Sequence, residues 1–229
     1  MSVNYPDRDI RQRDLVPPDR LATVHAVVVG VGAIGRQVAL QLAATGVPAM
    51  QLIDHDFVAV ENLAPQGYWP EDLGAAKVDA TGRLCQRIHP ELQFTCHADR
   101  FRRSTARLLD SLRASGQQVA LFCAVDSITT RKLIWETARE HVHFFADGRM
   151  SAEVIRTLAS GRPSADDYYA TTLFGAEQAY AGSCTAKSTL YAASIAAGLM
   201  VGQFARWLRG LPTDRDLTIN LLSAELSAA

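Results

Sequence analysis

The chain has 229 residues, of which 48% are hydrophobic, and its formal net charge is −1. This length and apolar content are sufficient for one domain with a sizeable core. The near-neutral charge gives no electrostatic reason to expect a nucleic-acid or membrane partner.

Short apolar runs alternate with helical segments through the first two thirds of the chain. The predicted strands are 25–29, 49–53, 92–96, 119–124 and 142–146, and the predicted helices are 33–45, 75–88, 104–114 and 127–141. This alternation predicts a Rossmann-like, doubly wound α/β fold with a mostly parallel sheet. The long connection at 55–74 is expected to be functional, since loops of that length are uncommon in compact domains.

The last third has a different pattern. An alternating run at 152–158 predicts an antiparallel strand, and a polar stretch at 160–186 predicts a long crossover loop. A helix at 188–209 and a strand at 217–222 follow. Three polar residues interrupt the apolar part of this helix, Ser194, Gln203 and Arg206, which favours a buried helix over a membrane span.

These elements divide a single domain into three parts. We expect an N-terminal arm at 1–23, a nucleotide-binding half at 24–148, and an antiparallel C-terminal extension at 149–229. The arm has no apolar run typical of a secretory signal, and the four cysteines are dispersed without a C-x-x-C pair. Reduced thiols in a cytoplasmic protein are therefore expected.

A glycine-rich turn joins the first strand to the first helix. Gly30, Gly32 and Gly35 form a G-x-G-x-x-G motif, which lets the backbone approach a phosphate and points a helix N-terminus at negative charge. Asp54 lies 19 residues after Gly35, where dinucleotide folds keep a carboxylate that binds ribose. These residues alone fit NAD as well as ATP.

The polar residues that follow favour ATP with a metal ion. They are Asp56, Asn62, Gln66, Lys77, Asp126 and Arg131. Lys77 lies in the first turn of a predicted helix, from which its side chain can reach phosphates. Asp126 ends the fourth strand, in the crevice where open α/β sheets bind ligands, and a carboxylate there suits Mg²⁺. For Arg131 the alternative is an ordinary surface charge.

In this order the motifs resemble the ThiF/MoeB/HesA superfamily, the adenylation domain of ubiquitin-activating enzymes and sulfur-carrier activators. The resemblance covers 8–146 and the late helix. It consists of R-x-x-R-Q at 8–12, G-x-G-x-x-G at 30–35, D-x-D at 54–56, N-L-x-R-Q at 62–66, G-x-x-K at 74–77, and Asp126 with Arg131. Two residues depart from the pattern, because Pro65 replaces an arginine that helps to hold the triphosphate and Ser127 replaces an asparagine. The zinc-binding C-x-x-C pairs of many members are absent, which implies a zinc-free variant.

The resemblance implies an enzyme that uses ATP and Mg²⁺ to adenylate the C-terminal glycine of a ubiquitin-like or sulfur-carrier β-grasp protein. By position, Asp54 would bind the ribose, Asn62 and Gln66 would orient phosphates, Lys77 would neutralise them, and Asp126 would hold Mg²⁺. The resemblance also implies a homodimer in which Arg11 crosses to the partner's ATP site.

Cys184 is the candidate acyl acceptor. It lies in the polar stretch before the late helix and is followed by Thr185, and the resemblance implies that such a cysteine forms a thioester. A helix N-terminus and the nearby Lys187 would lower its pKa. The alternative is an inert small residue. Cys85, Cys96 and Cys123 lie in apolar surroundings, where core packing is expected.

Three other functions stay open. An NAD-dependent enzyme would leave Asp56, Lys77, Asp126 and Arg131 without a role. A non-catalytic partner subunit is favoured by Pro65, whereas the retained Asp126 and Lys77 argue against it. An adenylyltransferase acting on a small molecule or on tRNA would have the same nucleotide site.

Overall fold

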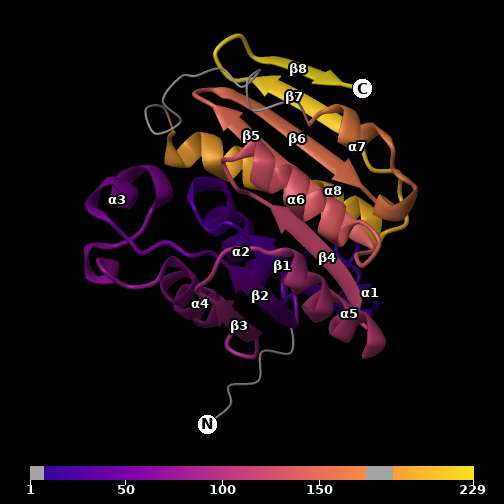
Figure 1. Cartoon of the computed structure of the whole chain (residues 1–229), viewed down its shortest axis with the longest axis horizontal. Coiled ribbons are helices and arrows are strands. Elements are labelled where there is room, and N and C mark those ends of the chain that lie inside the picture. Colours follow the sequence, from indigo (N-terminus) through magenta and orange to yellow (C-terminus); the bar gives the residue numbers. More distant parts are fainter. Residues whose placement is uncertain (1–7, 174–187) are drawn as a thin grey trace.

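Eight strands form one mixed sheet (Figure 1). The structure, a computed structural model of the chain, describes residues 8–173 and 188–229. The strand order is β3-β2-β1-β4-β5-β6-β7-β8, with the first five parallel and the last three antiparallel. The strands are β1 (Val24–Val29), β2 (Ala49–Ile53), β3 (Gln93–His97), β4 (Gln118–Cys123), β5 (Phe144–Ser151), β6 (Val154–Ser160), β7 (Asp216–Asn220) and β8 (Glu225–Ala228). The predicted parallel sheet with an antiparallel C-terminal extension is confirmed.

Helices cover both faces of the sheet. The longer ones are α2 (Ala33–Thr45), α4 (Lys77–Ile88), α5 (Ala106–Ala114), α6 (Ile128–Ala138) and α8 (Leu190–Leu208). Alternate residues of β1 divide between two cores: Ala26 and Val28 pack with α2 and α8, whereas Val27 and Val29 pack on the side of α5 and α6. The central strands are therefore buried on both faces, which explains their continuous apolar runs.

Most predicted elements agree with the structure within a few residues. The predicted bounds of α2 and β2 are those observed. The helix expected to run to residue 141 ends at Ala138. Strand β5 is longer than the predicted 142–146, because it continues into a hairpin in which Ser151 pairs with Val154 of β6.

Short elements within the expected loops were not predicted. The connection at 55–74 contains α3 (Val60–Gln66) and the 3₁₀ turn η1 (Pro70–Asp72). Residues after β6 form η3 (Pro163–Ala165) and α7 (Tyr168–Thr171). The sequence analysis also missed β8, whose residues are exposed and so lack the apolar alternation of a half-buried strand.

Helix α8 is part of the larger core, as its small apolar residues predicted. Ala192, Ala196 and Met200 are fully buried, and the helix packs against α2 and β5. Two short helical segments complete the described chain, α1 (Pro18–Leu21) and η2 (Arg103–Thr105). Within the described residues, no helix combines the length and apolarity needed to cross a bilayer.

Candidate nucleotide site

The glycine-rich turn connects the carboxyl end of β1 to α2, and two of its glycines are required by close packing. Gly30 has a φ of +84°, and a Cβ there would lie 2.8 Å from the carbonyl oxygen of Ala124. A Cβ on Gly35 would lie 1.7 Å from the carbonyl oxygen of Gly30. Gly32 differs, since a Cβ there would meet only the side-chain amide of Gln66, at 3.9 Å. Gly32 therefore leaves space at this edge, where a ligand can approach the backbone.

Asp54 ties the end of β2 to this turn. Its Oδ2 accepts a hydrogen bond from the backbone N–H of Val31 at 2.7 Å, and its Oδ1 accepts one from the N–H of Asp56 at 2.8 Å. Each carboxylate oxygen has a further lone pair. Asp54 therefore lies at the carboxyl edge beside the glycine turn, and its role as a ribose ligand stays a prediction.

Lys77 and Asp56 form an ion pair next to Asp54. The Lys77 Nζ lies 2.9 Å from Asp56 Oδ2, and the lysine side chain is only 7% exposed. Burial alone would raise the pKa of Asp56, but the hydrogen bond and charge of Lys77 outweigh it and hold that pKa below its usual value. The Lys77 backbone N–H also donates to the Asp56 carbonyl at 3.0 Å. The structure thus brings together Asp56, near the start of the long connection, and Lys77, just after its end.

Helix α3 carries both predicted amide side chains, and they differ in whether the amide oxygen is already hydrogen-bonded. Asn62 Oδ1 accepts a hydrogen bond from the backbone N–H of Ala59 at 2.9 Å, so this oxygen caps its own helix. Gln66 Oε1 is buried and has no hydrogen-bond partner in the described part of the chain. An unsatisfied buried acceptor is costly, and Gln66 lies beside Gly32, so it is the α3 residue most available to a ligand.

Asp126 lies in the turn between β4 and α6 and is exposed. Ser127 caps α6 by accepting the N–H of Thr130 at 3.3 Å. Among the described residues, Asp126 has no hydrogen bond or ion pair, so its carboxylate is free at the carboxyl edge of the sheet. That position fits the predicted magnesium ligand.

Arg131 lies in α6, as predicted, and its side chain is buried. It is neither a surface charge nor a free cation at the ligand edge, because its guanidinium is buried in an ion pair with Asp147. It also donates to the carbonyl oxygens of Val125 and, at 3.1 Å, of Gly148. Arg131 therefore holds the turn that carries Asp126 in place, and its direct contact with the nucleotide stays a prediction.

Asp147 is the site-supporting residue that the sequence analysis missed. It is fully buried on β5, where its Oδ2 accepts hydrogen bonds from Arg149 Nε at 2.7 Å and from the Tyr169 hydroxyl at 3.0 Å. Arg149 also donates to the carbonyl and hydroxyl oxygens of Thr172, at 2.9 and 3.0 Å. A charged residue directly after the apolar run of a buried strand was the available signal. This network joins the Asp126 turn to α7.

The N-terminal arm is held against the C-terminus of α2. Arg8 donates to the carbonyl of Ala43 at 2.8 Å and contacts His89 Nδ1 at 2.7 Å, and Gln12 donates to the carbonyl of Thr45 at 2.9 Å. Gln12 thus satisfies a carbonyl at the helix end, and Arg8 adds a second donor to the Ala43 carbonyl, which also accepts the Gly46 N–H. Arg11, between them, is exposed.

The candidate acyl acceptor Cys184 lies outside the described residues. The other three cysteines are packed as predicted, and burial raises the pKa of Cys85 and of Cys96 to about 12. Burial also raises the pKa of Cys123. Their thiols are therefore poor nucleophiles at neutral pH.

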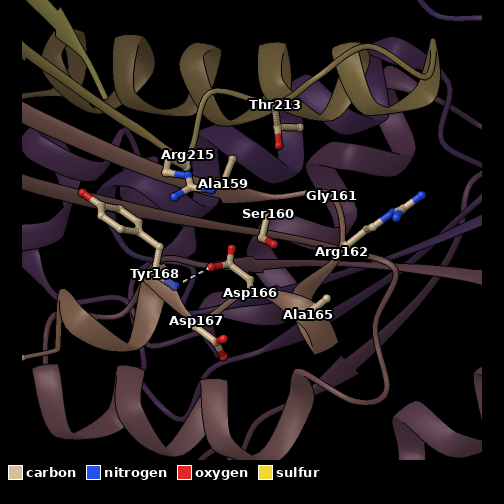
Figure 2. A pocket seen from close by; sticks show the side chains of 10 residues that line it. All are labelled: Ala159, Ser160, Gly161, Arg162, Ala165, Asp166, Asp167, Tyr168, Thr213 and Arg215. Carbon is tan, nitrogen blue, oxygen red and sulfur yellow. Dashed lines mark hydrogen bonds between the residues drawn. The ribbon is translucent and has the colours of Figure 1, made fainter.

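A separate polar recess lies at the opposite edge of the sheet (Figure 2). Ser160, in its wall, pairs with Phe145 at the start of β5, whereas the candidate site lies where the parallel strands end. Its polar groups contact one another: Asp166 accepts the N–H of Tyr168 at 2.9 Å, and Arg215 lies over the Tyr168 ring. None of the predicted site residues lines this recess.

Comparison with known proteins gives the family. The sequence matches the ThiF family over residues 8–227. The chain belongs to the ThiF family. Over 138 residues this chain is 30% identical to ubiquitin-like modifier-activating enzyme 5 from Drosophila ananassae. The aligned part covers 57% of this chain and 35% of that protein. Over 130 residues this chain is 35% identical to the adenylyltransferase and sulfurtransferase MOCS3 from Sus scrofa, and the aligned part covers 53% of this chain and 28% of MOCS3.

The chain therefore spans about a third of the length of these ThiF relatives. Among solved structures, that of PaaA superposes with a TM-score of 0.77 at 19% identity, covering all of this chain and 74% of PaaA. This similarity extends the ThiF-type fold to both the parallel and the antiparallel parts of the sheet. The ThiF motifs quoted from the sequence lie within the matched residues.

Proposed function

We propose that this protein uses ATP to adenylate the C-terminal carboxylate of a ubiquitin-like or sulfur-carrier protein. The observation that carries the proposal is the convergence of three features at the carboxyl ends of β1, β2 and β4: Gly32, the Lys77–Asp56 pair, and Asp126, which has no partner among the described residues. An open glycine turn, a lysine and a carboxylate at one edge of the sheet suit a nucleoside triphosphate bound with Mg²⁺. The adenylyltransferase and modifier-activating relatives support the same conclusion.

The residues present fit magnesium-bound ATP. Within residues 8–173 and 188–229, Asp126 has no partner and offers an oxygen ligand, and the buried Oε1 of Gln66 has no hydrogen-bond partner beside the open space at Gly32. Bound Mg²⁺ would neutralise phosphate charge and orient the triphosphate. Asp54 would hold the ribose hydroxyls, while Lys77 and Gln66 would bind phosphate oxygens.

The chemistry would need mainly positioning by this chain. A carboxylate oxygen of the carrier attacks the α-phosphorus, the bond from that phosphorus to the bridging oxygen breaks, and pyrophosphate leaves with the electron pair. The product is an acyl-adenylate. The glycine turn and Lys77 would stabilise charge on the phosphates during this step.

The first test is calorimetric titration with Mg-ATP and, separately, with NAD, on wild type and Asp126→Ala. We expect wild type to bind Mg-ATP, and the variant to lose magnesium-dependent binding and ATP–pyrophosphate exchange. Because Asp126 is exposed and has no partner in the described part of the chain, the thermal midpoint of Asp126→Ala should equal that of wild type. Asp167→Ala is the matched control, since Asp167 is an exposed aspartate beside the recess at the other edge. Unchanged exchange in Asp126→Ala would contradict the metal-ligand assignment, and NAD binding without ATP binding would contradict the proposed function.

Cys184 extends the proposal to a covalent intermediate. Its thiolate would attack the carbonyl carbon of the acyl-adenylate and release AMP, which leaves the carrier attached through a thioester. We expect Cys184→Ala to retain ATP–pyrophosphate exchange and to lose any reducible adduct with the carrier. Cys85→Ala is the control, since Cys85 is buried in the core. An adduct that persists in Cys184→Ala would contradict the assignment.

We further propose a cytoplasmic homodimer in which Arg11 reaches the partner's nucleotide. Its support is the contrast between Arg8 and Gln12, which hold the arm on α2, and the exposed Arg11 between them. A non-catalytic partner subunit remains the second candidate, because Pro65 removes one expected phosphate ligand. Failure to bind either nucleotide would favour it.

A further inference from the structure

Arg36 is a buried cation beside the glycine turn. It lies in the first turn of α2 and is 3% exposed. Its guanidinium carbon lies 4.7 Å from the centre of the Tyr68 ring, and one guanidinium nitrogen lies 3.5 Å from the carbonyl oxygen of Gln66. Among the described residues, its Nε has no hydrogen-bond partner and no carboxylate lies within ion-pair distance of the guanidinium.

This environment is unfavourable for an arginine without an anion. Burial lowers the pKa of Arg36, although the nearby Tyr68, Asp72 and Cys85 partly oppose that shift. Its place in the first turn adds the positive end of the helix dipole. One ring face and one long hydrogen bond replace only part of the lost hydration. A bound anion would complete the site.

The surroundings of Arg36 are also those of the predicted phosphate site. Gln66 presents its side-chain amide to Gly32 and its carbonyl to Arg36. The Tyr68 hydroxyl donates to the carbonyl of Val31, within the glycine turn, at 2.7 Å. Lys77, the other buried cation here, is already neutralised by Asp56. Arg36 is therefore the cation of this site that has no described counter-ion.

The residue at position 65 explains why a cation would be needed beside Gln66. The resemblance predicts an arginine in α3 where this chain has Pro65, immediately before the Gln66 carbonyl that Arg36 contacts. We propose that Arg36 replaces this arginine and binds the β- or γ-phosphate of the nucleotide. The inference rests on the proposed function, because it assigns a ligand within the same site. A planar guanidinium suits phosphate oxygens, which it can bind in pairs.

The test compares affinities for Mg-ATP and AMP by calorimetry in Arg36→Gln, Arg36→Lys and wild type. Arg209→Gln is the control, since it removes the same charge from an exposed arginine after α8. We expect Arg36→Gln to bind Mg-ATP about tenfold more weakly or worse, since a charge-assisted contact is lost, with AMP affinity changed less than about twofold. Arg36→Lys should retain part of the preference for Mg-ATP over AMP. It also replaces Arg36→Gln as the test variant if the glutamine variant fails to fold.

Two outcomes distinguish this inference from the function on which it rests. If wild type binds Mg-ATP and Arg36→Gln keeps the same ratio of ATP to AMP affinity, the inference is wrong and the function stands. If wild type binds neither nucleotide, the proposed function is wrong. A thermal-shift titration with inorganic tripolyphosphate then tests Arg36 alone: loss of the shift in Arg36→Gln supports an anion site, and absence of a shift in wild type overturns it.

Discussion

Replacement of Asp147 by asparagine tests the buried network that supports the candidate site. Asp147 is fully buried and is the common partner of Arg131, Arg149 and the Tyr169 hydroxyl. Asparagine preserves the shape of the side chain but removes its charge. Two arginine side chains, 7% and 15% exposed, would then share a buried region without a carboxylate.

The expected effect is large because one side of a buried ion pair is removed. Such changes cost about 3–5 kcal/mol. For a chain of this size each kcal/mol lowers the thermal midpoint by about 2–4 °C. We therefore expect Asp147→Asn to unfold about 6–20 °C below wild type. Nucleotide-dependent activity should fall as well, because Arg131 would no longer hold the Val125 carbonyl beside Asp126.

Thermal unfolding followed by circular dichroism measures the effect. Glu136→Gln is the matched control, because it removes a carboxylate from an exposed pair with Arg103 and should lower the midpoint by less than about 4 °C. Combining Asp147→Asn with Arg131→Met should recover part of the loss, since one uncompensated charge is then removed. An Asp147→Asn midpoint within about 1 °C of wild type would show that this reasoning is wrong.

Two further predictions use the glycine turn and a buried histidine. Gly35→Ala should destabilise the fold by about 3 kcal/mol or more, because its Cβ would overlap the Gly30 carbonyl, whereas Gly32→Ala should fold normally and bind ATP more weakly. Denaturant midpoints and ATP titrations of the pair check this, and equal stabilities would contradict it. Burial lowers the pKa of His25. As pH falls through about 6.5, the unfolded chain therefore binds a proton that folded His25 resists, and the free energy of unfolding decreases. Wild type should lose stability from pH 7 to 5 relative to His25→Gln, and parallel curves for the two proteins would contradict this assignment.

Local sequence determined where most of the site residues lie. Each strand that leads into the site is a short apolar run, and its polar residues follow directly, as Asp54 follows β2 and Asp126 follows β4. Since parallel strands end at one edge of a sheet, this order alone predicted that these residues would lie close to Gly30 and Gly32. The glycines could also be predicted from the sequence, because a tight turn between a strand and a helix depends on local residues.

Only the tertiary structure decided how the buried charges are paired. The sequence favoured a ligand contact for Arg131, with a surface charge as the alternative, whereas the structure pairs it with Asp147 on β5. Arg36 gave no signal in the sequence, since its isolation depends on what α3 and Tyr68 place around it. The physical reason is that the stability of a buried charge depends on counter-charges brought near by long-range packing. Sequence periodicity records which side chains are buried, but it does not record which of them meet.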